Sequence, residues 1–186
     1  MKNNLTEKYI KTINKWAEKY GIKELKINDK EKIFNLKQLC IFNTNIKYIP
    51  AAIFKLTNLK SLSIYCNNLN RLPKEICNLI NLKELYIHCE NLKSLPNEIE
   101  RLTNLESIHI ECENLKQLPK EIHNLIKLKR FDIDCPNSEN FPDGIAKLIN
   151  LETIYIINSN GKLNLQYLIG GIVKLNNLKS LYIDIE

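Results

Sequence analysis

Two histidines and three acidic residues of this chain recur at a spacing of 23 residues. His88 is followed 23 residues later by Glu111, His109 by Asp132, and Glu111 by Asp134. If these residues lie on neighbouring strands of one sheet, their histidine and carboxylate groups are within about 5 to 7 Å of one another. Groups of this kind can hold a metal ion or move protons.

The surroundings of these residues argue against catalysis. An open sheet face excludes little water, and no nucleophile or glycine-rich phosphate loop accompanies the cluster. We therefore expect no enzymatic activity, no cofactor and no metal at these residues. The fold alone does not decide function, so the prediction depends on the site itself.

Four cysteines show the same period, namely Cys66, Cys89, Cys112 and Cys135. On parallel strands about 4.8 Å apart their side chains point the same way, whereas a disulfide needs converging Cβ vectors. One tetrahedral metal ion is also disfavoured, because four ligands in a row roughly 15 Å long cannot converge on it. The sequence predicts free, buried thiols that pack in the core.

These spacings belong to a repeat that covers most of the chain. Each of the first five units is 23 residues long, and they begin at Leu36, Leu59, Leu82, Leu105 and Leu128. A sixth unit of 27 residues begins at Leu151, and a seventh begins at Leu178. Self-similarity at such a period is typical of a solenoid, in which each turn buries its apolar face against its neighbours.

The third unit shows what each turn contains. From Leu82 to His88 apolar residues alternate as in a half-buried strand, and Ile99 and Leu102 then follow at helical spacing. Between the two segments stands a proline, which suits the exit from a strand because it has no amide donor (Pro50, Pro73, Pro96, Pro119 and Pro142). One strand and one short helical turn per coil is the predicted structure.

This pattern resembles the leucine-rich repeat family, in its 23-residue type with a Leu-Pro-x-x-Ile-x-x-Leu-x-x-Leu second half. The resemblance covers residues 36–186 and implies a right-handed α/β solenoid whose parallel sheet forms a concave face. In that family the concave face usually binds a protein. Lys15 to Ile22 also resembles the N-terminal cap of bacterial intracellular leucine-rich repeat proteins. We divide the chain into residues 1–35, a capping helix with a degenerate first coil, and residues 36–186, the repeats.

One position departs from the family pattern. Where the family usually places an asparagine ladder, three residues after the second strand leucine, this chain has asparagine only at Asn67. Asparagine instead comes one place later, at Asn45, Asn68, Asn91, Asn114, Asn137 and Asn160. We expect these later side chains to satisfy backbone groups of the turns.

Residues 5–21 have the pattern of an amphipathic helix. Thr6 is expected to cap its start and Gly21 to end it in a left-handed conformation. Trp16 lies on the apolar face and is expected to close the open first coil, as terminal caps must. The degenerate first coil is expected to begin with Leu25 and Ile27.

The other end of the repeats is irregular. The sixth unit lacks the Leu-Pro pair and has four extra residues within Lys162 to Gly171, where the pair Gly170-Gly171 predicts a flexible turn. The last strand, Leu181 to Ile185, has no cap after it in this sequence. Its unpaired backbone edge predicts self-association through the C-terminal strand.

Residues between the buried strand positions are expected to form the concave surface. Aromatic residues occur there on five of the seven strands, and acids gather on the middle ones. Aromatics anchor many protein interfaces, although they are also good strand formers. The predicted partner-binding residues are Phe42, Tyr65, Tyr86, His88, His109, Glu111, Asp132, Asp134, Tyr155 and Tyr182.

The bulk composition limits the function further. The net charge of +6 comes largely from scattered lysines, and no nucleic-acid-binding motif is present, so we expect no nucleic-acid partner. No apolar run reaches the roughly 18 residues that span a bilayer, and the N-terminus lacks a signal peptide's apolar stretch, so we expect a cytoplasmic protein without a membrane partner. The predicted function is a non-catalytic protein-protein interaction module whose partner has a basic surface. The alternative is an accessory subunit or a fragment of a larger signalling or enzymatic protein.

Overall fold

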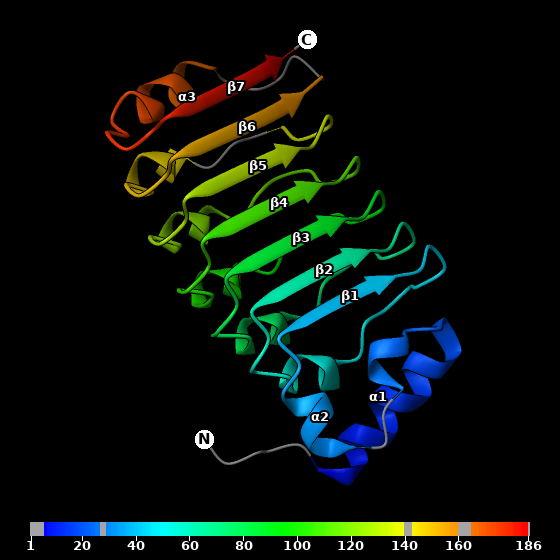
Figure 1. The fold of residues 1–186 in the computed structure, drawn as a ribbon. Helices are drawn as coiled ribbons and strands as arrows, with labels where there is room; N and C mark the ends of the chain where they lie inside the picture. The colour runs from blue at the N-terminus through cyan, green and yellow to red at the C-terminus, as the bar shows by residue number, and fades with distance from the viewer. Residues whose placement is uncertain (1–5, 27–28, 140–142, 160–164, 186) are drawn as a thin grey trace.

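The computed structural model describes residues 6–26, 29–139, 143–159 and 165–185. Its centre is one sheet of seven parallel strands, each paired with the strand that follows it in the chain (Figure 1). The strands are β1 (Gln38–Phe42), β2 (Ser61–Tyr65), β3 (Glu84–His88), β4 (Ser107–Glu111), β5 (Arg130–Asp134), β6 (Thr153–Asn158) and β7 (Ser180–Ile185). This arrangement confirms the predicted α/β solenoid. No helix among the described residues is long and apolar enough to cross a membrane.

Each coil runs from a strand into a short 3-10 helix. In β2, Leu62 and Ile64 are fully buried, and the residues that alternate with them face outward (Ser61, Ser63 and Tyr65). The 3-10 helices form the other side of the stack (Figure 1), and we call the outward sheet face the concave face. These helices are η2 (Ala51–Lys55), η3 (Lys74–Asn78), η4 (Asn97–Arg101), η5 (Lys120–Asn124) and η6 (Asp143–Lys147). The predicted strand-exit prolines precede η2 to η5 directly, and Pro142 lies outside the described residues.

The strands keep one register across the sheet. From β1 to β6 each residue pairs with the residue 23 places further along, as Tyr86 does with His109. Between β6 and β7 the step is 27 residues, which matches the longer sixth unit. Outward side chains therefore form columns that run across all seven strands.

Two rows of asparagines join successive coils. The Asn91 amide donates to the carbonyl of Asn67 at 2.8 Å, and Asn114 and Asn137 donate in the same way to Glu90 and Glu113, which confirms the predicted role at these three positions. For Asn45 and Asn68 it stays a prediction. Asn160 lies outside the described residues. A second row, which the sequence analysis missed, donates to carbonyls of the preceding coil and comprises Asn58, Asn81, Asn104, Asn150 and Asn177. The carbonyls of Asn67 and Glu90 also accept from the backbone amides of Asn91 and Asn114, so the first row adds a second donor to each.

The aligned cysteines are free and buried, as predicted. They lie at the ends of the strands, and the Cys89 sulfur is 3.8 Å from the carbonyl oxygen of Ile64. Burial raises the pKa of the Cys66 thiol to about 12 and that of Cys89 to about 11, so both are protonated at neutral pH. They act as small apolar residues of the core.

The N-terminal helix α1 (Glu7–Tyr20) covers the first coil. Trp16 is 3% exposed, and its indole nitrogen donates to the carbonyl of Tyr48 at 3.0 Å. Gly21 ends the helix with φ of 75°, as predicted. Thr6 occupies the N-cap position, as predicted, but its side chain makes no capping hydrogen bond, and its carbonyl oxygen accepts from the amides of Tyr9 and Ile10.

Two short segments connect α1 to β1. A 3-10 helix, η1 (Lys23–Leu25), buries Leu25, and Asp29 caps α2 (Lys30–Phe34) by accepting the amides of Glu31 and Lys32. Ile27 lies outside the described residues, so the degenerate first coil stays a prediction.

The predicted flexible turn at Gly170-Gly171 is wrong. Both glycines lie in a helix, α3 (Leu165–Ile172), which packs on η6 (Figure 1). A Cβ at Gly171 would come within 2.5 Å of a methyl carbon of Ile145, so glycine allows the two helices to approach closely. Residues 162–164 of the insertion lie outside the described residues.

Candidate functional site

The concave face brings the predicted residues into two adjacent columns. One column contains Tyr86, His109, Asp132, Tyr155 and Tyr182, which pair strand to strand from β3 to β7. The next column contains Phe42, Tyr65, His88, Glu111 and Asp134, which pair from β1 to β5. The expected lateral neighbours are therefore confirmed as neighbours.

Five side chains in the middle of this face form a chain of alternating bases and acids. Nδ1 of His88 lies 2.8 Å from Oε2 of Glu111, and the same oxygen lies 3.9 Å from Nε2 of His109. Nδ1 of His109 is 3.7 Å from Oδ2 of Asp132, which accepts a hydrogen bond from Nε of Arg130 at 2.6 Å. The series thus connects β3, β4 and β5 across the sheet.

Asp132 is the most buried member of this series. The residue is 5% exposed, and its second carboxylate oxygen, Oδ1, has no hydrogen-bond partner in the described chain. A buried carboxylate oxygen without a partner loses hydration and receives nothing in return, which costs free energy. Such a group is a candidate for an interaction that a ligand completes.

Asp134 lies beside Glu111 on the neighbouring strand. Its burial and then the negative charge of Glu111 raise the pKa of the Asp134 carboxyl, an effect that the two nearby histidines partly oppose. The pair is therefore a place where negative charge is concentrated and a cation is favoured.

Aromatic rings extend from both sides of this acidic centre. Phe42, Tyr65 and His88 form a row with successive ring centroids 6.0 Å apart. Tyr86 lies 6.2 Å from His109, whereas Tyr155 and Tyr182 stack at 4.7 Å near the other end of the sheet. Contacts of this kind restrict the orientation of the rings.

A shallow hollow of about 420 Å³ lies over the centre of the face. Its lining includes six of the ten predicted residues, which are Tyr65, Tyr86, His88, His109, Glu111 and Asp132. Phe42, Asp134, Tyr155 and Tyr182 lie on the same sheet face but do not line it. Arg130, which the sequence analysis did not choose as a site residue, does line it. Its position two residues before Asp132 on one strand was the available signal, because such residues share a face.

The chemistry of the hollow is that of an acceptor for cations. Its carboxylates and ring faces can accept a positively charged group, and His109 stands between two carboxylates. Among the described residues, no three or more histidine, cysteine, aspartate or glutamate side chains are placed to hold one metal ion.

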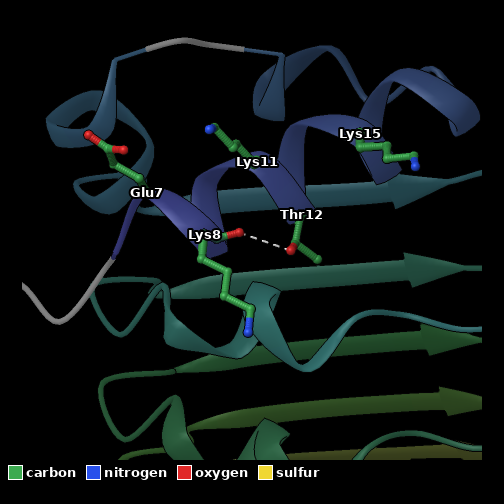
Figure 2. Close-up of a pocket in the computed structure, with 5 residues that line it drawn as sticks. All are labelled: Glu7, Lys8, Lys11, Thr12 and Lys15. Atoms are coloured by element: carbon green, nitrogen blue, oxygen red, sulfur yellow. Dashed lines mark hydrogen bonds between the residues drawn. The ribbon is translucent and has the colours of Figure 1, made fainter.

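A second hollow of about 530 Å³ lies on the exposed surface of α1. Figure 2 shows its lining residues, Glu7, Lys8, Lys11, Thr12 and Lys15, with the lysine side chains extending away from the helix axis. The Thr12 hydroxyl donates to the carbonyl of Lys8 at 2.9 Å, a bond within the helix itself. In the part of the chain that the structure describes, these lysines form no ion pair.

Three solved structures are similar in fold to most of this chain. The leucine-rich repeat domain of the type III effector XopL matches with a TM-score of 0.66 and 18% identity over 96% of this chain. A leucine-rich repeat protein of Leptospira interrogans matches with a TM-score of 0.52 and 22% identity over 82%. The plant peptide hormone receptor RGFR1, solved in complex with RGF2, matches with a TM-score of 0.56 and 26% identity over 75%. The chain covers 65%, 55% and 27% of these three chains, respectively.

Sequence comparison gives a result of the same kind. No curated protein sequence matches the chain significantly. The family model described as a leucine-rich repeat region matches residues 74–186, which is more than half of the chain. Together with the stacked parallel coils, this match shows that the chain belongs to the leucine-rich repeat family.

Proposed function

We propose that the protein is a non-catalytic module that binds another protein through its concave face. The observation that carries this proposal is the hollow over β2 to β5, where carboxylates and aromatic rings are held in register by neighbouring strands. Leucine-rich repeats commonly serve as protein-interaction modules, and one structure with similar coils is a plant peptide hormone receptor in complex with RGF2.

The expected partner has a basic surface. Glu111, Asp132 and Asp134 lie on adjacent strands of one face, and Arg130 offsets part of their charge. Clustered acids attract a complementary basic surface and make association sensitive to salt. The free, buried thiols are compatible with the cytoplasmic location expected from the sequence.

The alternative proposal is that these repeats are the recognition part of a larger signalling or enzymatic protein. This alternative is supported by the similar structures, because each of their chains is longer than the part that matches this protein. The same concave face would bind the partner in either case. The two proposals are distinguished by the sequence of the gene, because coding sequence for a further domain would favour the larger protein.

The test is affinity capture from lysate of the source organism with three versions of the chain. They are the wild type, a concave variant carrying Glu111→Lys and Asp134→Lys, and a control carrying Glu98→Lys and Glu121→Lys on η4 and η5. The control makes the same change of charge on the other side of the coils. A protein captured by the wild type and the control, and bound about tenfold more weakly by the concave variant, supports the proposal. Equal capture by all three folded versions contradicts it.

The edge of β7 supports a second, separate interaction. Within the described sheet β7 pairs only with β6, and Leu181 and Tyr182 are 48% and 47% exposed. An exposed apolar edge strand favours pairing with another copy. Light scattering of this 186-residue chain should show growth of particle mass with concentration, which Ile183→Lys with Ile185→Lys should abolish. A monomer at every concentration would contradict self-association.

A further inference from the structure

The hollow on the concave face contains a carboxylate that the chain itself satisfies only in part. Asp132 lines the hollow, is 5% exposed, and has one oxygen without a hydrogen-bond partner among the described residues. Its other oxygen faces Arg130 and His109. An incoming donor that reaches both oxygens would remove the cost of the unpaired one.

Arg130 holds Asp132 by a single point of contact. The bond runs from Nε to Oδ2 at 2.6 Å, and the Arg130 side chain is 59% exposed. A guanidinium bound to a carboxylate in the optimal geometry uses two parallel N–H donors, which this contact does not. Because most of the Arg130 side chain lies in solvent, it can rotate away from Asp132 at little packing cost.

The walls of the hollow suit a flat cation. Tyr65 and Tyr86 lie on neighbouring strands at one side, and each is in contact with a histidine ring that fixes its orientation. On the other side Glu111 lines the same space, with 45% of its side chain exposed and its Oε2 atom 2.8 Å from Nδ1 of His88. A planar guanidinium can lie against tyrosine rings while its edge donates to carboxylates.

We propose that this hollow binds one arginine side chain of the partner, whose guanidinium pairs with Asp132 and Glu111 next to His109 and Tyr86 and displaces Arg130. This inference rests on the proposed function, because it names the chemistry that the concave face recognises. Arg130 then acts as an internal competitor that occupies Asp132 until the partner arrives.

Arginine fits these features better than the two other small cations. A lysine ammonium is a compact, strongly hydrated point charge and cannot donate bidentately to a carboxylate. A metal ion needs several ligands that converge on one point, and the described residues offer no such group. A partly satisfied carboxylate, a second carboxylate and aromatic rings in one hollow therefore favour a guanidinium over these two cations.

The test is an NMR titration at neutral pH with N-acetyl-arginine N-methylamide, whose backbone is uncharged. The ring signals of His88 and His109 report on the hollow. We expect saturable shifts, with affinity about tenfold higher than for the citrulline analogue, which is neutral but nearly the same shape, and clearly higher than for the lysine analogue. Equal affinity for citrulline or for lysine would overturn the assignment.

Three variants make the test specific. Asp132→Asn and Glu111→Gln should each weaken binding of the arginine probe by about fivefold or more, and Arg130→Gln should strengthen it by about threefold because the competitor is gone. Asp184→Asn, at the β7 end of the face, is the matched control and should change nothing. If Asp132→Asn does not fold, the half-exposed Glu111 keeps the test decisive. Weaker binding in Arg130→Gln would overturn the role of Arg130 as competitor.

The result separates this inference from the proposed function. If partner capture depends on Glu111 and Asp134 but the arginine probe does not bind in the hollow, the concave interface is supported and the arginine site is wrong. If the probe binds in the hollow while capture is indifferent to the concave variant, the arginine site is supported and the proposed function is wrong.

Discussion

The hollow on α1 and the hollow on the concave face differ in construction as well as in charge. The α1 hollow is lined by lysines that extend into solvent from one helix, and the hydrogen bond of the Thr12 hydroxyl stays within that helix. The concave hollow draws its lining from four strands, and its side chains contact one another across them. A buried, partly unsatisfied carboxylate lies only in the second among the residues described.

The difference shows why a concentration of charge is a weak indicator of a site. Solvated lysines lose rotamer freedom and hydration when they bind, so each contributes little. Side chains already held by neighbouring strands lose less, because folding has ordered them beforehand. We therefore expect substitutions on the two hollows to differ both in binding and in stability, and the following experiments test that expectation.

The largest expected effect is a loss of stability when the packing of α1 on the first coil is removed. Trp16→Ala removes a buried ring and its bond to Tyr48, and should lower the free energy of unfolding by about 3 to 5 kcal/mol. Chemical denaturation measures this loss. The ring signals of His88 and His109 should keep their positions, since coils contact only their neighbours. Shifted histidine signals would show that the two hollows are coupled.

The second effect concerns the interior beneath the concave hollow. Cys89 follows His88, faces the core and is fully buried. Cys89→Ser places a hydroxyl there and should cost about 1 to 3 kcal/mol in denaturation experiments. Exposed Cys40 is the control, and Cys40→Ser should stay within about 0.5 kcal/mol of the wild type. Similar losses for both would mean that the cysteine row does not support the sheet.

Comparing one residue from each hollow tests the contrast in binding. Tyr86→Ala removes a ring from the concave hollow and should weaken binding of the arginine probe by about 1 kcal/mol, or about fivefold. Lys11→Ala on α1 should leave that affinity unchanged. NMR titration of both variants gives the answer. Weaker binding by Lys11→Ala would show that the probe is attracted by the overall field rather than by the hollow.

The smallest expected effect concerns a surface carboxylate that is paired with two lysines. Hydrogen bonds from Lys83 and Lys129 lower the pKa of Glu106 to about 2. A lowered carboxyl pKa stabilises the fold above about pH 4.5, and this contribution is lost as the pH falls to about 2. Because the group is at the surface, Glu106→Gln should lower the thermal midpoint at neutral pH by only about 2 °C, and this effect should shrink as the pH falls towards 2. A larger drop at acidic pH would contradict this sign.

The period of the sequence predicted much of the fold and of the site. Leucine and isoleucine at fixed positions must face the core. Residues 23 places apart therefore become lateral neighbours on adjacent strands, whatever their own side chains are. That reasoning places His88 beside Glu111 without any knowledge of side-chain conformation. It applies equally to the buried cysteines.

Features that depend on individual side-chain packing were not predictable. The partner of Arg130 is chosen by rotamers, and the burial of Asp132 by what its neighbours cover. Gly170-Gly171 has the composition of a turn, and only the proximity of Ile145 explains a helix there. The asparagine row before the strands was detectable from its period, but its acceptors lie in the preceding coil.

The constant step between strands has a genetic consequence. Deletion of residues 105–127 by unequal recombination would remove one complete unit and bring β3 beside β5, with the buried positions still aligned. Tyr86 would then neighbour Asp132, and His88 would neighbour Asp134, while His109 and Glu111 would be gone. A single change in repeat number can thus give descendants of this gene a differently composed recognition surface without a new fold.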